Sequence, residues 1–265
     1  MIKGFLEEAA LPAFEGQLVG LIAPHAGYIY SGLTAAHAFK ALLGRQFARV
    51  ILLSPSHQPY RQPLLTTSHD AYSTPLGLVP VDREALARLN ELLKESGGVE
   101  LAAVRRDQEH SLEIELPFLQ VTQPNGFGLV PLMMVDQSAL MARLLSAALL
   151  KLIQSFPPEE STLLLASSDL SHFYSERAAN RLDGNLADAL REFDLNAFYQ
   201  RKQHGEMEAC GFAPMATVLQ TSRLLGAEQV TVADYRTSAA VTGDRSSVVG
   251  YLSAIISTGK AGQHA

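Results

Sequence analysis

The sequence has little that would tie the protein to a secretory route, a membrane or nucleic acid. It holds one cysteine among 265 residues, so an intrachain disulfide is excluded and no oxidising compartment is needed. Charged residues interrupt every apolar stretch before about 18 residues, the length that a transmembrane helix requires. The opening segment carries Lys3, Glu7 and Glu8 and does not resemble a signal peptide. From these absences we expect a cytoplasmic protein.

Basic residues are also in deficit, and several common catalytic motifs are missing. Acidic residues outnumber basic ones by 27 to 21, and the resulting formal charge of −6 disfavours nucleic acid or an anionic membrane as a partner. There is no P-loop, G-x-G-x-x-G, G-x-S-x-G or C-x-x-C motif. These gaps weaken nucleotide, dinucleotide, serine-hydrolase and zinc-ribbon interpretations.

The apolar pattern predicts one α/β domain over residues 1–265. The apolar fraction of 47% is ordinary for a globular protein. Buried strands are expected at 17–23, 50–53, 127–134, 162–166, 230–235 and 248–256. Helices are expected at 32–43, after Asp82, around 141–152, and at 176–190, 195–203 and 212–224. This alternation predicts a three-layer α/β/α sandwich with a largely parallel central sheet. The polar segment 64–80 is expected to form a hairpin or a long loop over the site.

Two histidines directly follow predicted strands. His25 follows the first strand and His57 the second, and consecutive strands of a sheet are usually neighbours. Ligands bind beyond the carboxyl ends of parallel strands, so the two imidazoles are expected to lie close enough to share an ion. Taken singly, His25 is equally consistent with a side chain that donates to a nearby carbonyl.

The only cysteine lies in a loop before a predicted helix. Cys210 is flanked by small residues, and a helix N-terminus favours the thiolate, the form that binds metal or attacks an electrophile. The alternative is a small buried apolar residue, the usual role of a lone cysteine.

Two further segments carry groups suited to proton transfer. Asp169 and His172 follow a strand; on a turn of helix they would point the same way, and the carboxylate would fix the tautomer of a catalytic imidazole. The alternative is an aspartate N-cap with a surface histidine. His110 and Glu109 are equally consistent with orienting a metal ligand or with exposed positions behind Asp107 as a cap. Pro117 is expected to kink the helix that follows.

Taken in order, these segments resemble those of the Memo family, including the Memo-like protein of AmmeMemoRadiSam systems. Each motif is modest alone, whereas the ordered set is specific and covers nearly the whole chain. The set consists of 24–28 (PHAGY), 30–32 (YSG), 54–57 (SPSH), 107–111 (DQEHS), 167–172 (SSDLSH), 209–211 (ACG), 235–238 (YRTS) and 243–248 (GDRSSV).

The resemblance implies a fold and a ligand set. Memo-type proteins are similar in fold to the catalytic subunit of class III extradiol dioxygenases, which hold Fe(II) with two histidines and a carboxylate and use another histidine as acid and base. Carried onto this sequence, the resemblance implies His25, His57 and Cys210 as metal ligands, with cysteine in the carboxylate's place. It implies His172 as the catalytic histidine of the pocket, with Asp169 and His110 nearby.

The resemblance also implies a cofactor and partners. Thiolate keeps the ligand charge but softens the site, which favours Cu(I) or zinc more than a carboxylate would. We expect a divalent metal ion, iron first, with copper and zinc as alternatives. Prokaryotic members are often encoded beside a radical-SAM protein and an AMMECR-type protein, which implies a shared modification pathway.

Three functions compete at this point. The first is a metal-dependent, dioxygenase-like redox enzyme acting on an unknown small molecule or peptide. The second is a metal- or peptide-binding module that catalyses nothing. The third is metal-free catalysis with Cys210 as nucleophile and a histidine as base, which leaves two histidines without a role.

Overall fold

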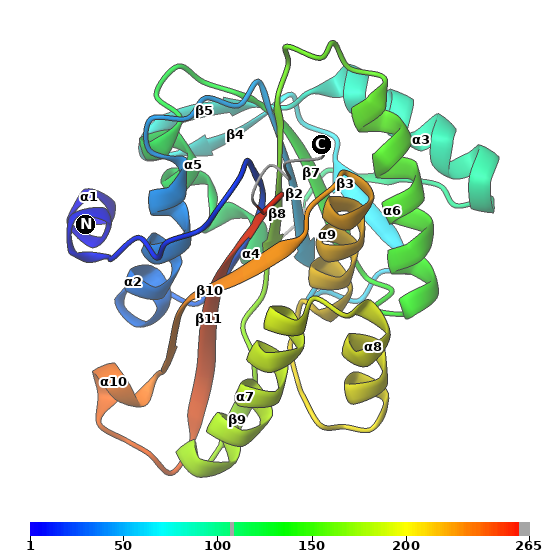
Figure 1. The fold of residues 1–265 in the computed structure, drawn as a ribbon. Coiled ribbons are helices and arrows are strands. Elements are labelled where there is room, and N and C mark those ends of the chain that lie inside the picture. Colours follow the sequence, from blue (N-terminus) through cyan, green and yellow to red (C-terminus); the bar gives the residue numbers. More distant parts are fainter. Residues whose placement is uncertain (107–108, 260–265) are drawn as a thin grey trace, which may run out of the picture.

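A mixed sheet forms the middle layer of the protein (Figure 1). The chain is known from a computed structural model, which describes residues 1–106 and 109–259. The strand order is β10-β11-β1-β8-β2-β7-β3-β6, and β9 pairs with β11. These strands are β1 (Leu18–Ala23), β2 (Arg49–Pro55), β3 (Leu64–Thr67), β6 (Ala102–Val104), β7 (Gly128–Met134), β8 (Thr162–Ser167), β9 (His172–Tyr174), β10 (Gln229–Thr237) and β11 (Val248–Ser257).

The centre of this sheet is parallel and its flanks are antiparallel. β1, β8, β2 and β7 run parallel, whereas β11 is antiparallel to β1, and β3 is antiparallel to β7. Leu21, Ile51 and Leu164 on the central strands are completely buried. Nearly continuous apolar strands are what a sheet covered on both faces requires.

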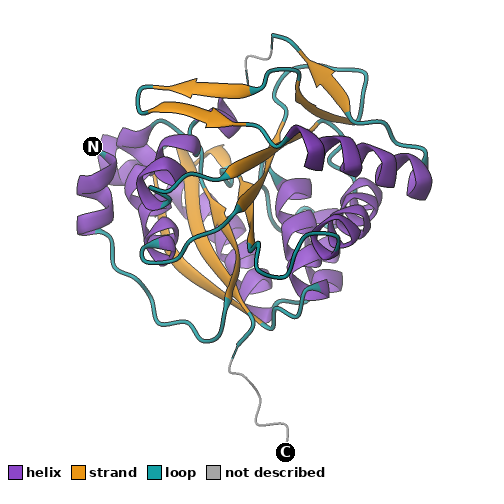
Figure 2. Cartoon of the chain, turned by 90° about the horizontal axis from the view of Figure 1, so that it is seen from above, coloured by secondary structure: helices purple, strands orange, loops and turns teal. Residues whose placement is uncertain are grey.

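Helices cover both faces of the sheet, which gives the predicted α/β sandwich (Figures 1 and 2). α1, α2 and α5 lie on one side, and α3, α6 and α9 on the other. The helices are α1 (Ile2–Glu8), α2 (Tyr28–Phe39), the 3-10 helix η1 (Lys40–Leu42), α3 (Arg83–Gly97), α4 (His110–Glu113), α5 (Leu116–Thr122), α6 (Ala139–Gln154), α7 (Glu176–Glu192), α8 (Leu195–Gln203), α9 (Phe212–Leu224) and α10 (Ala239–Thr242). In the described part of the chain, no helix combines the length and the apolar character needed to cross a membrane.

Most predicted elements are confirmed, with two differences among the helices. α2 begins at Tyr28 instead of residue 32, because the chain already turns into the helix at Gly27. Pro117 does not kink a helix. α4 ends at Glu113, and Pro117 lies in the first turn of α5, where its missing N–H leaves no hydrogen bond unmade. Asp82 caps α3 as predicted, by accepting from the amide of Ala85.

The polar segment 64–80 divides between two sheets. β3 joins the central sheet, and β4 (Ala71–Thr74) pairs with β5 (Gly77–Pro80) as a separate hairpin. At the turn of this hairpin, the hydroxyl of Thr74 accepts from the amide of Leu76 and so closes the turn.

The expectation that β1 and β2 are neighbours is wrong, because β8 lies between them. β8 is apolar and buried like both of them, and it pairs in parallel with each. Ile22 and Leu53 both align with Ala166. The two strands therefore deliver His25 and His57 at nearly the same level, one on each side of the end of β8.

Candidate metal centre

Two imidazoles and one thiol meet at the carboxyl edge of the parallel strands. His25, His57 and Cys210 offer ligand atoms that all lie within 4.8 Å of one another. The His25 Nε2 atom is 3.3 Å from the Cys210 Sγ atom, and the centroids of the two imidazole rings are 5.4 Å apart. A nitrogen and a sulfur bound to one tetrahedral zinc ion lie about 3.5 Å apart, given bond lengths of about 2.0 and 2.3 Å. The donor set therefore fits one ion.

His25 is buried and held from both ends. Its backbone N–H donates to Asp169 Oδ1 (2.8 Å), and its ring Nδ1 lies 2.8 Å from Ser167 Oγ. Burial lowers the pKa of His25 to about 3, helped by the charges of His57 and His110. The ring is therefore neutral near pH 7, the state in which an imidazole binds a metal.

A hydroxyl and a buried carboxyl set the tautomer of His25. Ser167 Oγ lies 2.6 Å from Ser111 O and 3.0 Å from Glu115 Oε1. Burial raises the pKa of Glu115 well above its usual range, against the hydrogen bond from Ser167. The Ser167 hydroxyl donates to Ser111 O and Glu115 Oε1, so toward His25 its oxygen acts as an acceptor and Nδ1 carries the hydrogen. The lone pair of His25 Nε2 then faces the cluster.

His57 is oriented by an ionised carboxylate. Its Nδ1 lies 2.9 Å from Glu109 Oε1, and its backbone N–H donates to Glu109 Oε2. Contact with the Cys210 sulfur and then with Glu109 raises the pKa of His57 to about 10. Burial pushes the pKa of Glu109 upward, but hydrogen bonds from His57 and Ser111 bring it to about 2. Glu109 therefore has the orienting role that was one of its two sequence interpretations.

The backbone of the 167–170 segment surrounds Cys210. The amide of Asp169 donates to Cys210 Sγ (3.3 Å), and the amide of Gly211 donates to Ser168 Oγ (2.9 Å). A Cβ at Gly211 would lie 2.4 Å from Ser167 O, so only glycine permits this approach. As predicted, Cys210 directly precedes the N-cap of α9. Cys210 also contacts a histidine, as metal-free cysteine catalysis requires.

The predicted pairing of Asp169 with His172 is wrong. The segment between them is not helical, and Asp169 Oδ1 accepts from the amides of His25 and Ala26. Asp169 thus anchors the loop that carries His25. Burial raises the pKa of Asp169 to about 7, against the effect of those two amides.

His110 contacts both histidines of the cluster, and His172 acts on His25 electrostatically. The half-buried His172 begins β9, and its charge contributes to the low pKa of His25. The exposed His110 ring stacks on the His57 ring at 5.5 Å and meets the His25 ring edge-on at 5.9 Å. The alternative cap Asp107 lies outside the described residues; Glu109 caps α4 by accepting from the amide of Ser111.

Sequence reasoning missed Glu115 and the role of Ser167. Ser167 is the last residue of an apolar strand, and in the sequence it resembles any polar residue that ends a strand. Glu115 is preceded by Ile114 and followed by Leu116, and only this apolar setting hinted at burial. Neither residue carried a signal that pointed to His25.

Comparison with known proteins places the chain among Memo-like sequences. Residues 1–255 match the Memo family, described as Memo-like protein. A MEMO1 family protein of Nitrosopumilus maritimus is 36% identical over 234 residues, covering 88% of this chain and 82% of the relative. A MEMO1 family protein of Thermotoga maritima is 35% identical over 242 residues, covering 90% and 82%. One from Saccharolobus solfataricus is 32% identical over 234 residues, covering 88% and 81%.

Proposed function

This chain belongs to the Memo family, and we propose that it is a metal-dependent redox enzyme that holds one ion between His25, His57 and Cys210. The observation that carries the proposal is the convergence of three donor atoms within 4.8 Å from three separate loops. Each histidine has its second ring nitrogen tied to a partner, the usual arrangement around metal ligands.

The donor set supports iron first, with copper and zinc as alternatives. Two imidazoles with one anionic ligand resemble the set that suits non-haem Fe(II), while the thiolate moves the preference toward Cu(I) and zinc. A bound iron or copper ion would supply electron transfer to dioxygen and open positions for substrate. By this proposal the chemistry is related to that of class III extradiol dioxygenases.

The surrounding side chains would divide the remaining tasks. His172 would move a proton to or from the substrate, because it acts electrostatically on His25 and is partly accessible to solvent. Asp169 would hold His25 in place through its backbone. His110 would contact substrate beside His57.

Metal content after anaerobic purification tests the site. Wild-type protein should retain close to one equivalent of metal by elemental analysis, and His25→Ala and Cys210→Ser should each lose most of it. His204→Ala is a matched control, because His204 ends the distant α8 and is largely exposed. Full loading of both site variants would overturn the proposal.

A second candidate is a non-catalytic metal- or peptide-binding module. The observation that favours it is the thiol in the place where the dioxygenases carry a carboxylate. Under this proposal the chain would act beside a radical-SAM protein and an AMMECR-type protein. Dioxygen uptake with catechols or a partner-derived substrate, lost in His172→Ala, would reject the module and support the enzyme.

A further inference from the structure

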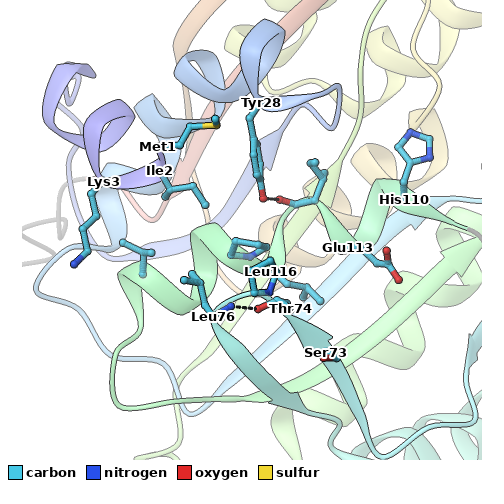
Figure 3. Close-up of a pocket in the computed structure, with 14 residues that line it drawn as sticks. Met1, Ile2, Lys3, Tyr28, Ser73, Thr74, Leu76, His110, Glu113 and Leu116 are labelled. Carbon is cyan, nitrogen blue, oxygen red and sulfur yellow. Dashed lines mark hydrogen bonds between the residues drawn. The ribbon is translucent and has the colours of Figure 1, made fainter.

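A pocket of about 570 Å³ is shown in Figure 3, and one of its lining residues, His110, contacts His57 of the candidate metal centre. Its walls come from α1, the start of α2, the turn between β4 and β5, and the α4–α5 segment. Most of the lining is apolar, including Ile2, Leu76, Ile114, Leu116 and Val121. The volume lies within the range of about 300–1,000 Å³ that is typical of small-molecule sites.

The short helix α4 joins this pocket to the metal centre. His110 lines the pocket and stacks on the His57 ring at 5.5 Å. Its neighbours also contact the centre, because Glu109 bonds the His57 ring and the backbone carbonyl of Ser111 accepts from the Ser167 hydroxyl. The His110 ring is therefore in contact with both the pocket and the cluster.

Two polar side chains in the pocket wall, Tyr28 and Thr74, are already bonded to protein. The Tyr28 hydroxyl donates to Ile114 O (2.8 Å), and Thr74 Oγ1 pairs with Gln120 Oε1 (2.6 Å) while accepting from the Leu76 amide. Charged groups lie at two ends, with Lys3 at one and Glu113 beside His110 at the other (Figure 3). The interior thus offers apolar contact, and polar recognition is confined to the ends.

We infer that this pocket binds the apolar, uncharged body of a small molecule whose polar head passes His110 to the His25–His57–Cys210 cluster. The inference rests on the proposed function for the role of the head. The body is an alkyl or aryl group, because a charged body would lose its hydration in the apolar interior without gaining a partner there. Substrate class is then set by the α1, β4–β5 and α5 walls.

Chain-length series of probes test the pocket with and without metal. On metal-free protein, 4-alkylphenols from methyl to hexyl should bind more tightly by about fourfold per added methylene, measured by titration calorimetry. On Zn²⁺-loaded protein, n-alkyl hydroxamates should show the same increment above acetohydroxamate, which presents the head alone. Both increments should end once the pocket is filled.

Two variants of one hairpin provide a matched comparison. Leu76 and Leu78 are both exposed, but only Leu76 lines this pocket. Leu76→Asp should remove the chain-length dependence and leave acetohydroxamate binding unchanged, whereas Leu78→Asp should behave as wild type. The inference is overturned by affinity that does not rise with chain length in wild type, or by equal losses in the two variants. If wild-type protein does not bind Zn²⁺ but its affinity for the 4-alkylphenols still rises with chain length, the proposed function is refuted and the inference about the pocket is retained.

Discussion

Replacing Ser167 with alanine should weaken metal binding although the residue contacts no metal. Ser167 is the only residue seen to bond the Nδ1 of His25 among the described residues, at 2.8 Å, and it links that ring to Ser111 and Glu115. Without the hydroxyl, the ring is free to rotate or to move its proton to Nε2, which removes the lone pair that faces the cluster.

The expected losses can be bounded from these contacts. Removing a group that orients a metal ligand typically lowers affinity by about 10–100-fold, or about 1.4–2.7 kcal/mol. The substitution also leaves the buried Glu115 carboxyl without its bonded partner, which should lower the free energy of unfolding by about 1–3 kcal/mol. Metal affinity and stability should thus both fall, while the fold is retained.

Competition with a chromophoric chelator, together with urea unfolding, would measure both effects. Ser253→Ala is the matched control, because Ser253 is equally buried but its hydroxyl has no hydrogen-bond partner among the described residues. The control should leave metal affinity unchanged and stability equal or slightly higher. A folded Ser167→Ala protein that binds metal within twofold of wild type would refute the role assigned to the Ser167 hydroxyl.

Three further predictions concern other parts of the site and its support. Gly211→Ala should cost about 1–3 kcal/mol of unfolding free energy, because its Cβ would meet Ser167 O, whereas Gly184→Ala in α7 meets nothing within 4 Å and should be neutral or stabilising in urea unfolding. Equal effects of the two would contradict this. Burial raises the pKa of Asp183, so folding favours its protonated form, and the stability it contributes is lost as pH rises from its ordinary value through the raised one. The unfolding free energy of wild type minus that of Asp183→Asn should therefore fall as pH rises; a flat or rising difference would refute the assignment. Bound Zn²⁺ should slow alkylation of Cys210 by iodoacetamide at least about tenfold, read from the mass of the singly modified chain, and an unchanged rate would place the thiol outside the metal site.

The sequence predicts the layers of this fold well because burial on both sides leaves a strong signal. The run from Thr162 to Ala166 predicts a buried strand, which is β8, and the helical spacing around Leu145 and Leu149 is found in α6. What the local pattern does not contain is strand order. β8 lies between β1 and β2 because strand pairing depends on tertiary packing, and the hydrophobic periodicity of one segment carries no information about it.

The candidate ligands were predictable for a related reason, and their supports were not. His25 and His57 each follow a recognisable strand end and Cys210 precedes a helix, which favours one edge of the sheet, and the family resemblance implied that the three form one ligand set. Asp169 lies at the same edge, yet its carboxylate turns to the amide of His25 instead of to His172. That choice depends on the path of a non-helical loop, which a spacing of three residues cannot reveal.

Two glutamates beside the cluster have pKa values that are shifted in opposite directions. Glu109 and Glu115 are both buried, and each lies behind one histidine of the cluster. Hydrogen bonds from the imidazole and amide of His57 bring the pKa of Glu109 to about 2 against the effect of burial, whereas burial raises the pKa of Glu115 well above its usual range against a hydrogen bond from Ser167. Both arrangements leave the Nε2 atom of their histidine facing the cluster, because Glu109 bonds Nδ1 of His57 directly and Glu115 accepts from the serine that bonds Nδ1 of His25. Because the two carboxyls make different contacts, Glu109→Gln and Glu115→Gln should differ. The first removes a charge beside His57, whereas the second keeps a side-chain oxygen that accepts from Ser167, so metal affinity should fall in Glu109→Gln and change little in Glu115→Gln.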